Sequence, residues 1–183
     1  TFGSGSNVNP VWAGDGQRIM FRSSDESGTR LAMMRADGGG SPEIVFDKFR
    51  RGSWSFDWSV ASRAVVYDAS AEGGAPDLWT LPLDGDKRAK ALFETPAVEY
   101  QPQVSPDGRW VAYVSNESGR EEVYVQSFPE TGSKRQVSYG GGNQPRWRPD
   151  GRELYFVTLD STIMAAQVSA STAVDVRTPV VLF

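Results

Sequence analysis

Carboxylates are the side chains of this sequence that are best suited to chemistry. The 183 residues include 23 Asp and Glu but no His and no Cys. Ser-His-Asp and Cys-His catalysis, thiol redox chemistry and the usual zinc sites therefore cannot be assembled within the chain. Two carboxyl groups about 5 or 6.5–9.5 Å apart could still hydrolyse a glycosidic bond. Asp57, Glu99 and Glu130 are candidates, but no spacing fixes them as a pair, so we predict no catalytic residue and no enzyme.

Three short motifs hint at other chemistry and fail on spacing. "SPDGRW" at 105–110 superficially resembles the S-x-D-x-G-x-x-W box of sialidases, but Gly108 directly follows Asp107 and Trp110 comes too early. "SSDESGTR" and "SNESGREE" lack the alternating oxygen ligands of a calcium loop. The two "GGG" runs precede neither a helix nor a Lys-Ser/Thr pair, as a phosphate cradle would. We read all of them as turns and loops, and predict no metal and no cofactor.

These turns belong to an internal repeat. Asp15, Asp107 and Asp150 occupy the same place in similar segments, at spacings of 92 and 43 residues. A further copy lies between the first two, where "SVASRAVVY" aligns with "SPDGRWVAY" but lacks the Pro-Asp-Gly turn. The third apolar run of each copy keeps the same register, at Leu31, Leu78, Val123 and Ile163. Four units of 40–47 residues therefore fill nearly the whole chain.

Each unit contains the parts of a small antiparallel sheet. A hairpin turn such as Ser105-Pro106-Asp107-Gly108 leads into an apolar run, "RIMF", "RAVVY", "RWVAYV" or "ELYFV", that requires cover on both faces. A polar loop, a third strand and a short last strand follow; the last strands are "EIVF", "ALF", "RQVS" and "VVLF". Such units are typical of β-propeller blades. We expect an all-β fold with four four-stranded blades, at about 9–50, 51–95, 96–141 and 142–183, in a single domain or part of one. The tryptophans at strand positions are expected to pack between blades: Trp54, Trp58, Trp79, Trp110 and Trp147.

Composition and charge restrict the possible partners. The net charge of −4 gives no general attraction to nucleic acid or to anionic membranes, and no apolar run reaches the roughly 18 residues of a membrane span. We therefore expect no nucleic-acid partner and no direct membrane insertion. The segment "TFGSGSNVNP" has neither an initiator Met nor the parts of a signal peptide. "TF" is similar to the end of an outer strand, so we expect the chain to be a piece of a longer one, cut between blades.

The second half of the chain resembles a known family. The "SPDGRWVAY" turn, the "EVYVQSFP" strand and the "GGGNQPRWRPDGRELYF" junction are similar to the WD40-like (PD40) repeats of TolB-type propellers found at the C-terminus of bacterial serine/threonine kinases and in some membrane-tethered transcriptional regulators. The likeness extends over residues 9–183. The resemblance implies a non-catalytic propeller that binds protein or senses a ligand, commonly six-bladed and often outside the cytoplasmic membrane. Four repeats are too few for that ring, so we expect a fragment of a larger propeller, or an open arc that associates with a second copy.

Propellers usually bind at the mouth of their central channel, so we place the candidate partner site there. Loops that lead into the innermost strands should present Lys48, Arg50, Arg51, Glu99, Tyr100, Tyr139, Asn143 and Gln144. Gln101, Gln103 and Arg146 should begin these strands and face the channel. The mixture of Tyr, Arg and amide groups suits a protein or peptide partner.

Three functional hypotheses follow from these residues. The first is an interaction or sensory propeller attached to a signalling protein such as a serine/threonine kinase. The second is the propeller of a carbohydrate-active enzyme or peptidase whose catalytic residues lie in another domain. The third is a purely structural array, in which joint replacement of Arg50, Tyr100 and Tyr139 would change no activity of the parent protein.

Overall fold

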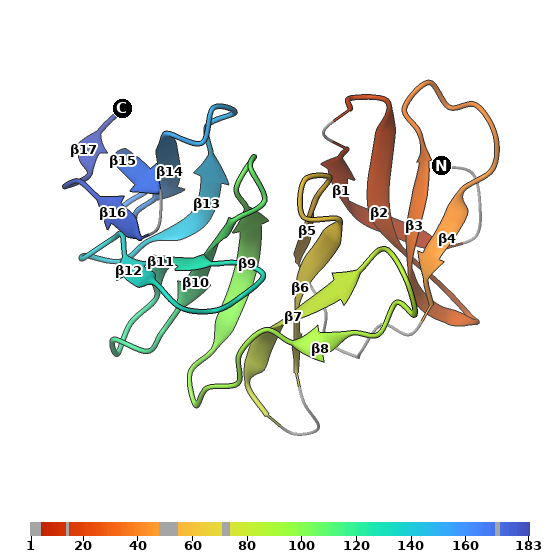
Figure 1. Cartoon of the computed structure of the whole chain (residues 1–183), viewed down its shortest axis with the longest axis horizontal. Coiled ribbons are helices and arrows are strands. Elements are labelled where there is room, and N and C mark those ends of the chain that lie inside the picture. Colours follow the sequence, from red (N-terminus) through yellow and green to blue (C-terminus); the bar gives the residue numbers. More distant parts are fainter. Residues whose placement is uncertain (1–4, 14, 48–54, 71–73, 171–172) are drawn as a thin grey trace.

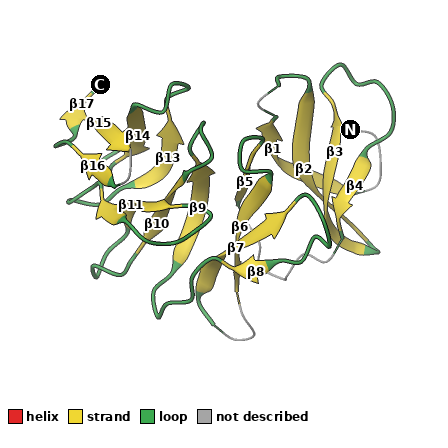
Figure 2. Ribbon diagram, viewed as in Figure 1, coloured by secondary structure: helices red, strands yellow, loops and turns green. Residues whose placement is uncertain are grey.

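Four antiparallel sheets make up the computed structural model, which describes residues 5–13, 15–47, 55–70, 74–170 and 173–183. Strands in these ranges are joined by loops, with no helix among them (Figure 2). The first two sheets, blades 1 and 2, consist of β1 (Ser6–Trp12), β2 (Arg18–Asp25), β3 (Gly28–Arg35) and β4 (Glu43–Phe46), then β5 (Phe56–Ser59), β6 (Ala64–Ser70), β7 (Pro76–Pro82) and β8 (Lys90–Ala91). Blade 3 contains β9 (Glu99–Val104), β10 (Trp110–Ser115), β11 (Glu122–Ser127) and β12 (Lys134–Gln136). Blade 4 contains β13 (Asn143–Trp147), β14 (Glu153–Val157), β15 (Ile163–Ala170), β16 (Val174–Val176) and β17 (Val180–Val181).

The sheets follow one another in an arc, with the first strand of each on its inner side (Figure 1). This arrangement confirms the predicted all-β propeller architecture of four blades. The predicted register is also confirmed, because Leu31, Leu78, Val123 and Ile163 pair with Arg22, Asp68, Val114 and Val157, which occupy one aligned position in the second strands.

The turn between the first and second strands is kept in all four blades. Gly16, Gly108 and Gly151 take φ values of 65°, 72° and 71°, a left-handed conformation that glycine adopts without steric cost. Blade 2 has no glycine here, and Arg63 takes the positive φ instead, at 49°. Ser59 Oγ supports that turn by accepting a hydrogen bond from Ser62 N at 3.2 Å. The missing Pro-Asp-Gly therefore changes the chemistry of the turn but leaves the hairpin intact.

The outermost strands differ from the prediction in length and number. β4 coincides with "EIVF", whereas β8 and β12 end before the buried residues Leu92 and Val137. Each of these residues still donates one backbone hydrogen bond to the third strand, to Leu78 O and Val123 O respectively, and turns its side chain into the core. In blade 4, β16 was not predicted: it pairs with one end of β15 and β17 pairs with the other.

Apolar side chains fill each junction between neighbouring blades. Three clusters centre on Tyr67 and Leu81 between blades 1 and 2, on Tyr113 and Val111 between blades 2 and 3, and on Trp110, which meets blade 4. Trp58, Trp79, Trp110 and Trp147 all pack against these clusters as predicted, while Trp54 lies outside the described residues. The apolar runs of the sequence therefore stabilise the contacts between blades.

Candidate functional site

Four equivalent segments form the inner side of the arc. "NPVW" at 9–12, "SFDW" at 55–58, "QPQV" at 101–104 and "QPRW" at 144–147 occupy the same place in blades 1 to 4. Asn9, Gln101 and Gln144, the first residues of three of them, have φ values of 55°, 53° and 52°. A non-glycine residue rarely takes this conformation. The pairing of β1, β9 and β13 with their neighbours shifts register at these points, so each of these three strands carries a bulge.

Polar side chains at the bulges connect successive blades. Gln101 N donates to Ser55 Oγ at 2.9 Å, and Gln144 N donates to Gln101 Oε1 at 2.8 Å. A backbone amide in one blade is thus satisfied by the equivalent side chain of the preceding blade. Gln101 and Gln144, which were predicted to bind a partner, therefore link successive blades of the arc.

A second row of contacts joins the blades further along the same strands. Trp58 Nε1 donates to Trp12 O at 3.2 Å, and Trp147 Nε1 donates to Gln103 O at 3.0 Å. Between blades 2 and 3, where no tryptophan is available, Asp57 Oδ2 accepts a hydrogen bond from Val104 N at 2.7 Å. Asp57 is therefore a structural residue between two blades.

The inner strands surround a pocket of about 380 Å³, which we call the channel pocket. Residues of blades 1, 2 and 3, together with one from blade 4, line it: Asn9, Pro10, Val11, Ser55, Phe56, Asp68, Tyr100, Gln101, Pro102, Gln103 and Arg146. This volume lies at the lower end of the range of ligand pockets.

Burial and a nearby positive charge shift the pKa of Asp57 in opposite directions. Burial raises the pKa of Asp57 to about 6, although hydrogen bonds from the backbone of Val104 and Trp58 and the positive charge of Arg146 act to lower it. Burial, and then the adjacent Glu121, raise the pKa of Tyr100 as well. Tyr100 is therefore a neutral hydroxyl at physiological pH.

Four of the predicted site residues come together at this pocket. Tyr100, Gln101, Gln103 and Arg146 line it, as expected for residues of the channel. Their side chains supply both kinds of hydrogen-bonding group, because amides donate and accept while the guanidinium donates. Such a mixture suits the alternating N–H and C=O groups of a peptide. Their role in binding remains a prediction.

The other predicted residues lie elsewhere. Glu99 and Asn143 begin β9 and β13 and do not lie in loops, and the side chain of Glu99 is only 1% exposed. Thr95 Oγ1 donates to Glu99 Oε1 at 2.6 Å, which ties the preceding loop to the strand. The expectation that Glu99 lies at the rim was wrong, because its side chain is buried and is bonded to the loop before β9. Tyr139 is a loop residue and is 73% exposed, outside the pocket.

The last predicted site residues are Gln144 and a short basic segment. Gln144 is exposed on β13 and contacts Gln101 through its backbone. Lys48, Arg50 and Arg51 lie outside the described residues.

Sequence reasoning missed the contribution of blades 1 and 2 to the pocket. Asn9, Ser55 and Asp68 line it, and Asp68 Oδ1 accepts a hydrogen bond from Ser55 N at 2.7 Å. An alignment of the four inner segments would have identified Asn9 and Ser55, because they occupy the column of Gln101 and Gln144. No sequence signal marks Asp68, which reaches the pocket from the second strand.

The first of the loops that hinted at calcium holds its Asp25 carboxylate by internal contacts. Asp25 Oδ1 accepts hydrogen bonds from Ser27 N at 2.9 Å and from Arg30 at 2.6 Å. Across the part of the chain that the structure describes, no three acidic side chains gather where they could hold a metal ion. The same residues include no helix that is long and apolar enough to cross a membrane.

Comparison with other proteins connects the chain to TolB. No family model matches it. A TolB homologue of Chlorobaculum tepidum is 26% identical over 57% of this chain and 26% of its own length. TolB of the Tol-Pal system in Hahella chejuensis is 36% identical over 43% of this chain and 19% of its own length. Tricorn protease homolog 1 of Streptomyces coelicolor is 36% identical over 45% of this chain and 8% of its own length. The matches span about a quarter or less of these relatives.

Solved structures show the same architecture over nearly the whole chain. A TolB protein of Agrobacterium tumefaciens superimposes with a TM-score of 0.76 and 18% identity, covering 99% of this chain and 67% of its own. TolB of Acinetobacter baumannii gives 0.74 and 18%, covering 96% and 44%. A puromycin-hydrolysing peptidase of Mycobacterium tuberculosis gives 0.66 and 17%, covering 98% and 31%. The chain thus has a TolB-like propeller fold, and its sequence is similar to parts of TolB proteins.

Proposed function

We propose that this chain is a non-catalytic interaction module that binds a protein or peptide at the channel pocket. The observation that carries the proposal is the convergence of Tyr100, Gln101, Gln103 and Arg146 on one pocket. Two of the three carboxylates considered for catalysis have structural partners instead, since Asp57 accepts a hydrogen bond from Val104 N and Glu99 accepts one from Thr95. Similarity to a protein named for the Tol-Pal system supports a role in a protein assembly.

The wider setting of the module is also a proposal. We infer that it belongs to a longer bacterial signalling protein, such as a serine/threonine kinase, and acts outside the cytoplasm. The similarity to TolB proteins supports the proposed location. The proposed attachment to a kinase is supported only by the resemblance of the repeats. Cell fractionation of a strain with a tagged parent protein tests the location, and a tag found only in the cytosol would contradict it.

Selection of peptides on the purified 183-residue chain tests the binding site. We expect peptides from a random displayed library to bind, and Arg146→Ala and Gln103→Ala to weaken their binding at least tenfold. Arg88→Ala is the control, because Arg88 has a side chain that is 86% exposed and lies outside the channel pocket. The proposal would be contradicted by peptides that bind the wild type, the two pocket variants and the control with equal affinity. A library that yields no binding peptide would also contradict it.

A peptidase propeller is the second candidate function. The tricorn protease homolog and the mycobacterial peptidase favour it. In this case the chain would admit or orient a peptide, and another domain would supply the nucleophile and base. Hydrolysis of fluorogenic peptides by the parent protein but not by the isolated chain would support this candidate, whereas turnover by the isolated chain would overturn the non-catalytic assignment.

Self-association is the second proposed interaction. Tyr155 and Val157 on the outer face of blade 4 are only partly buried, and Val180 and Val181 are 62% and 65% exposed. Apolar surface of this kind favours contact with another blade. We expect light scattering to show a dimer or larger assembly of the chain, and Val157→Lys to shift it toward a monomer. A monomeric wild-type chain would contradict this.

A further inference from the structure

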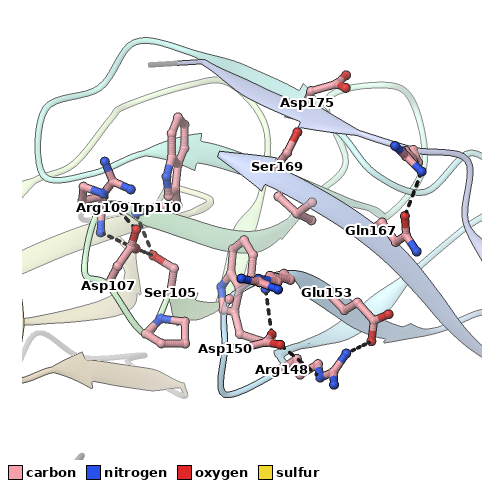
Figure 3. A pocket seen from close by; sticks show the side chains of 16 residues that line it. Ser105, Asp107, Arg109, Trp110, Arg148, Asp150, Glu153, Gln167, Ser169 and Asp175 are labelled. Atoms are coloured by element: carbon pink, nitrogen blue, oxygen red, sulfur yellow. Dashed lines mark hydrogen bonds and ion pairs between the residues drawn. The ribbon is translucent and has the colours of Figure 1, made fainter. Parts of the chain in front are cut away.

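A larger pocket lies between blades 3 and 4, on residues that the channel pocket does not share. It has a volume of about 870 Å³ and is formed by the first turns of the two blades together with β15 and the segment around β16 (Figure 3). We call it the interblade pocket. Its volume lies within the range of small-molecule sites.

The pocket exists because two equivalent turns sit differently against their neighbours. A Cβ added at Gly108 would lie 2.7 Å from Ser62 N, so the turn of blade 3 presses on the turn of blade 2. At the equivalent Gly151, the nearest atom to an added Cβ would be Pro106 Cδ, at 3.7 Å. The turns of blades 3 and 4 therefore stand further apart than those of blades 2 and 3.

The wall of the pocket contains a buried donor without a partner. Trp110 is 4% exposed, and its Nε1 makes no hydrogen bond within the described part of the chain. By contrast, Trp58 and Trp147 both donate from Nε1 to a backbone carbonyl. Buried indole N–H groups usually have a partner, because an unmet donor is costly. Nε1 itself has less than 1 Å² of accessible surface, so an acceptor in the pocket reaches it only after a neighbouring side chain has moved.

Charged groups in the pocket balance one another. The lining contains four guanidinium and four carboxylate groups: Arg109, Arg148, Arg152 and Arg177 with Asp107, Asp150, Glu153 and Asp175. Several are already paired, as Arg148 with Glu153 at 3.3 Å and Arg109 with Asp107 at 2.8 Å. Figure 3 shows these pairs on opposite sides of the hollow, with Gln167 and Ser169 on a third side.

This chemistry selects a ligand class. An anion would meet four carboxylates, a cation would meet four guanidinium groups, and an apolar ligand would desolvate the ion pairs at a cost. A hydroxyl group can donate to a carboxylate and accept from a guanidinium, so it satisfies both members of a pair. A ligand with many hydroxyl groups therefore fits a neutral lining that is rich in both donors and acceptors.

We propose that the interblade pocket binds a neutral oligosaccharide, whose hydroxyl groups contact the Asp107–Arg109 pair and Arg148 with its two carboxylate partners, Asp150 and Glu153. One of its oxygens accepts the hydrogen bond of Trp110 Nε1 once a neighbouring side chain has moved aside. This activity is independent of the channel pocket and of peptide binding there. It involves no bond cleavage, so the site is a binding site only.

Saturation-transfer difference NMR on the 183-residue chain tests the proposal. The probes are maltotriose, cellotriose and triacetylchitotriose. Inorganic phosphate is the anionic comparison, and its binding is followed by phosphorus-31 line broadening because it has no carbon-bound proton. We expect saturable binding of at least one trisaccharide and no comparable binding of phosphate. Trp110→Phe, which removes the N–H donor, and Asp150→Asn should each weaken trisaccharide binding about tenfold.

Matched controls separate the site from general destabilisation. Trp58→Phe makes the same change outside the pocket, and Asp86→Asn removes a carboxylate that is 77% exposed; neither should alter saccharide binding. If Trp110→Phe fails to fold, the Asp150→Asn variant provides the test, because the side chain of Asp150 is exposed. Absence of binding by all three trisaccharides, binding that survives Asp150→Asn, or preference for phosphate would overturn the proposal.

Discussion

The second strands of blades 3 and 4, β10 and β14, occupy equivalent positions but are covered differently. All six residues of β10 are buried, whereas in β14 only Leu154 and Phe156 are buried and the other three residues are partly exposed. Both runs are similarly apolar in sequence. Among the described residues, blade 3 packs against apolar clusters shared with blades 2 and 4, whereas blade 4 shares such a cluster with blade 3 alone, and this accounts for the difference.

The first turns of blades 3 and 4 also differ in how closely they pack against the preceding blade. Gly108 of blade 3 is pressed against blade 2, and Gly151 of blade 4 borders an open pocket. The same repeat therefore supplies rigid packing at one junction and a potential binding site at the next. Three predictions test this comparison.

Replacement of the turn glycines should have the largest effect. Both Gly108→Ala and Gly151→Ala place a side chain at positive φ, which costs about 1–2 kcal/mol. Gly108→Ala also forces a Cβ against the backbone of Ser62, so its total cost should be about 3–4 kcal/mol. Urea unfolding of the two variants measures the difference. Equal destabilisation would show that the two turns are packed alike.

The pH dependence of stability should report the junction between blades 2 and 3. Because burial raises the pKa of Asp57 to about 6 from 3.8, the folded state binds this proton more tightly than the unfolded chain. The contribution of Asp57 therefore lowers stability by about 2–3 kcal/mol as pH rises from about 4 to 6, and is constant above that.

Asp57→Asn should remove this part of the pH dependence while keeping an oxygen that can accept from Val104 N. Urea unfolding of wild type and variant at pH 4, 5, 6 and 7 tests it. Parallel stability profiles for the two proteins would contradict the assignment. Asp86→Asn, at an exposed carboxylate, is the control.

Shortening an aligned valine pair should have the smallest effect. Val114 on β10 is fully buried, and Val157, its equivalent on β14, is partly exposed. We expect Val114→Ala to cost about 2 kcal/mol and Val157→Ala less than about 1, since the latter removes less buried surface. Thermal or urea unfolding gives both values. A cost for Val157→Ala equal to that of Val114→Ala would indicate that blade 4 is covered in solution, for example by a second copy.

The repeat made much of the fold predictable. The register of Leu31, Leu78, Val123 and Ile163 could be read from spacing because each blade repeats the same hydrogen-bonded ladder. In blade 4 the prediction of "VVLF" located β17, but β16 was missed, because its three-residue pairing with β15 depends on local contacts that no pattern encodes.

The candidate site was predictable only in part. Tyr100, Gln101, Gln103 and Arg146 were found from their place before or within the inner strands, and the structure brings them to one pocket. Glu99 was predicted at the rim, but its side chain is buried. Its burial depends on the contact with Thr95 in the preceding loop, and residue spacing does not show such a contact. Asp68 was missed because its role depends on contact between two strands.

The sequence by itself determined the blades, since periodic apolar runs and turn residues specify sheets locally. It also excluded every mechanism that needs histidine or cysteine. Only the tertiary structure decided which junctions close and which leave a pocket, because the distance between two turns depends on how whole blades pack. The interblade pocket and the buried indole of Trp110 belong to this second level, since both arise where blades 3 and 4 meet.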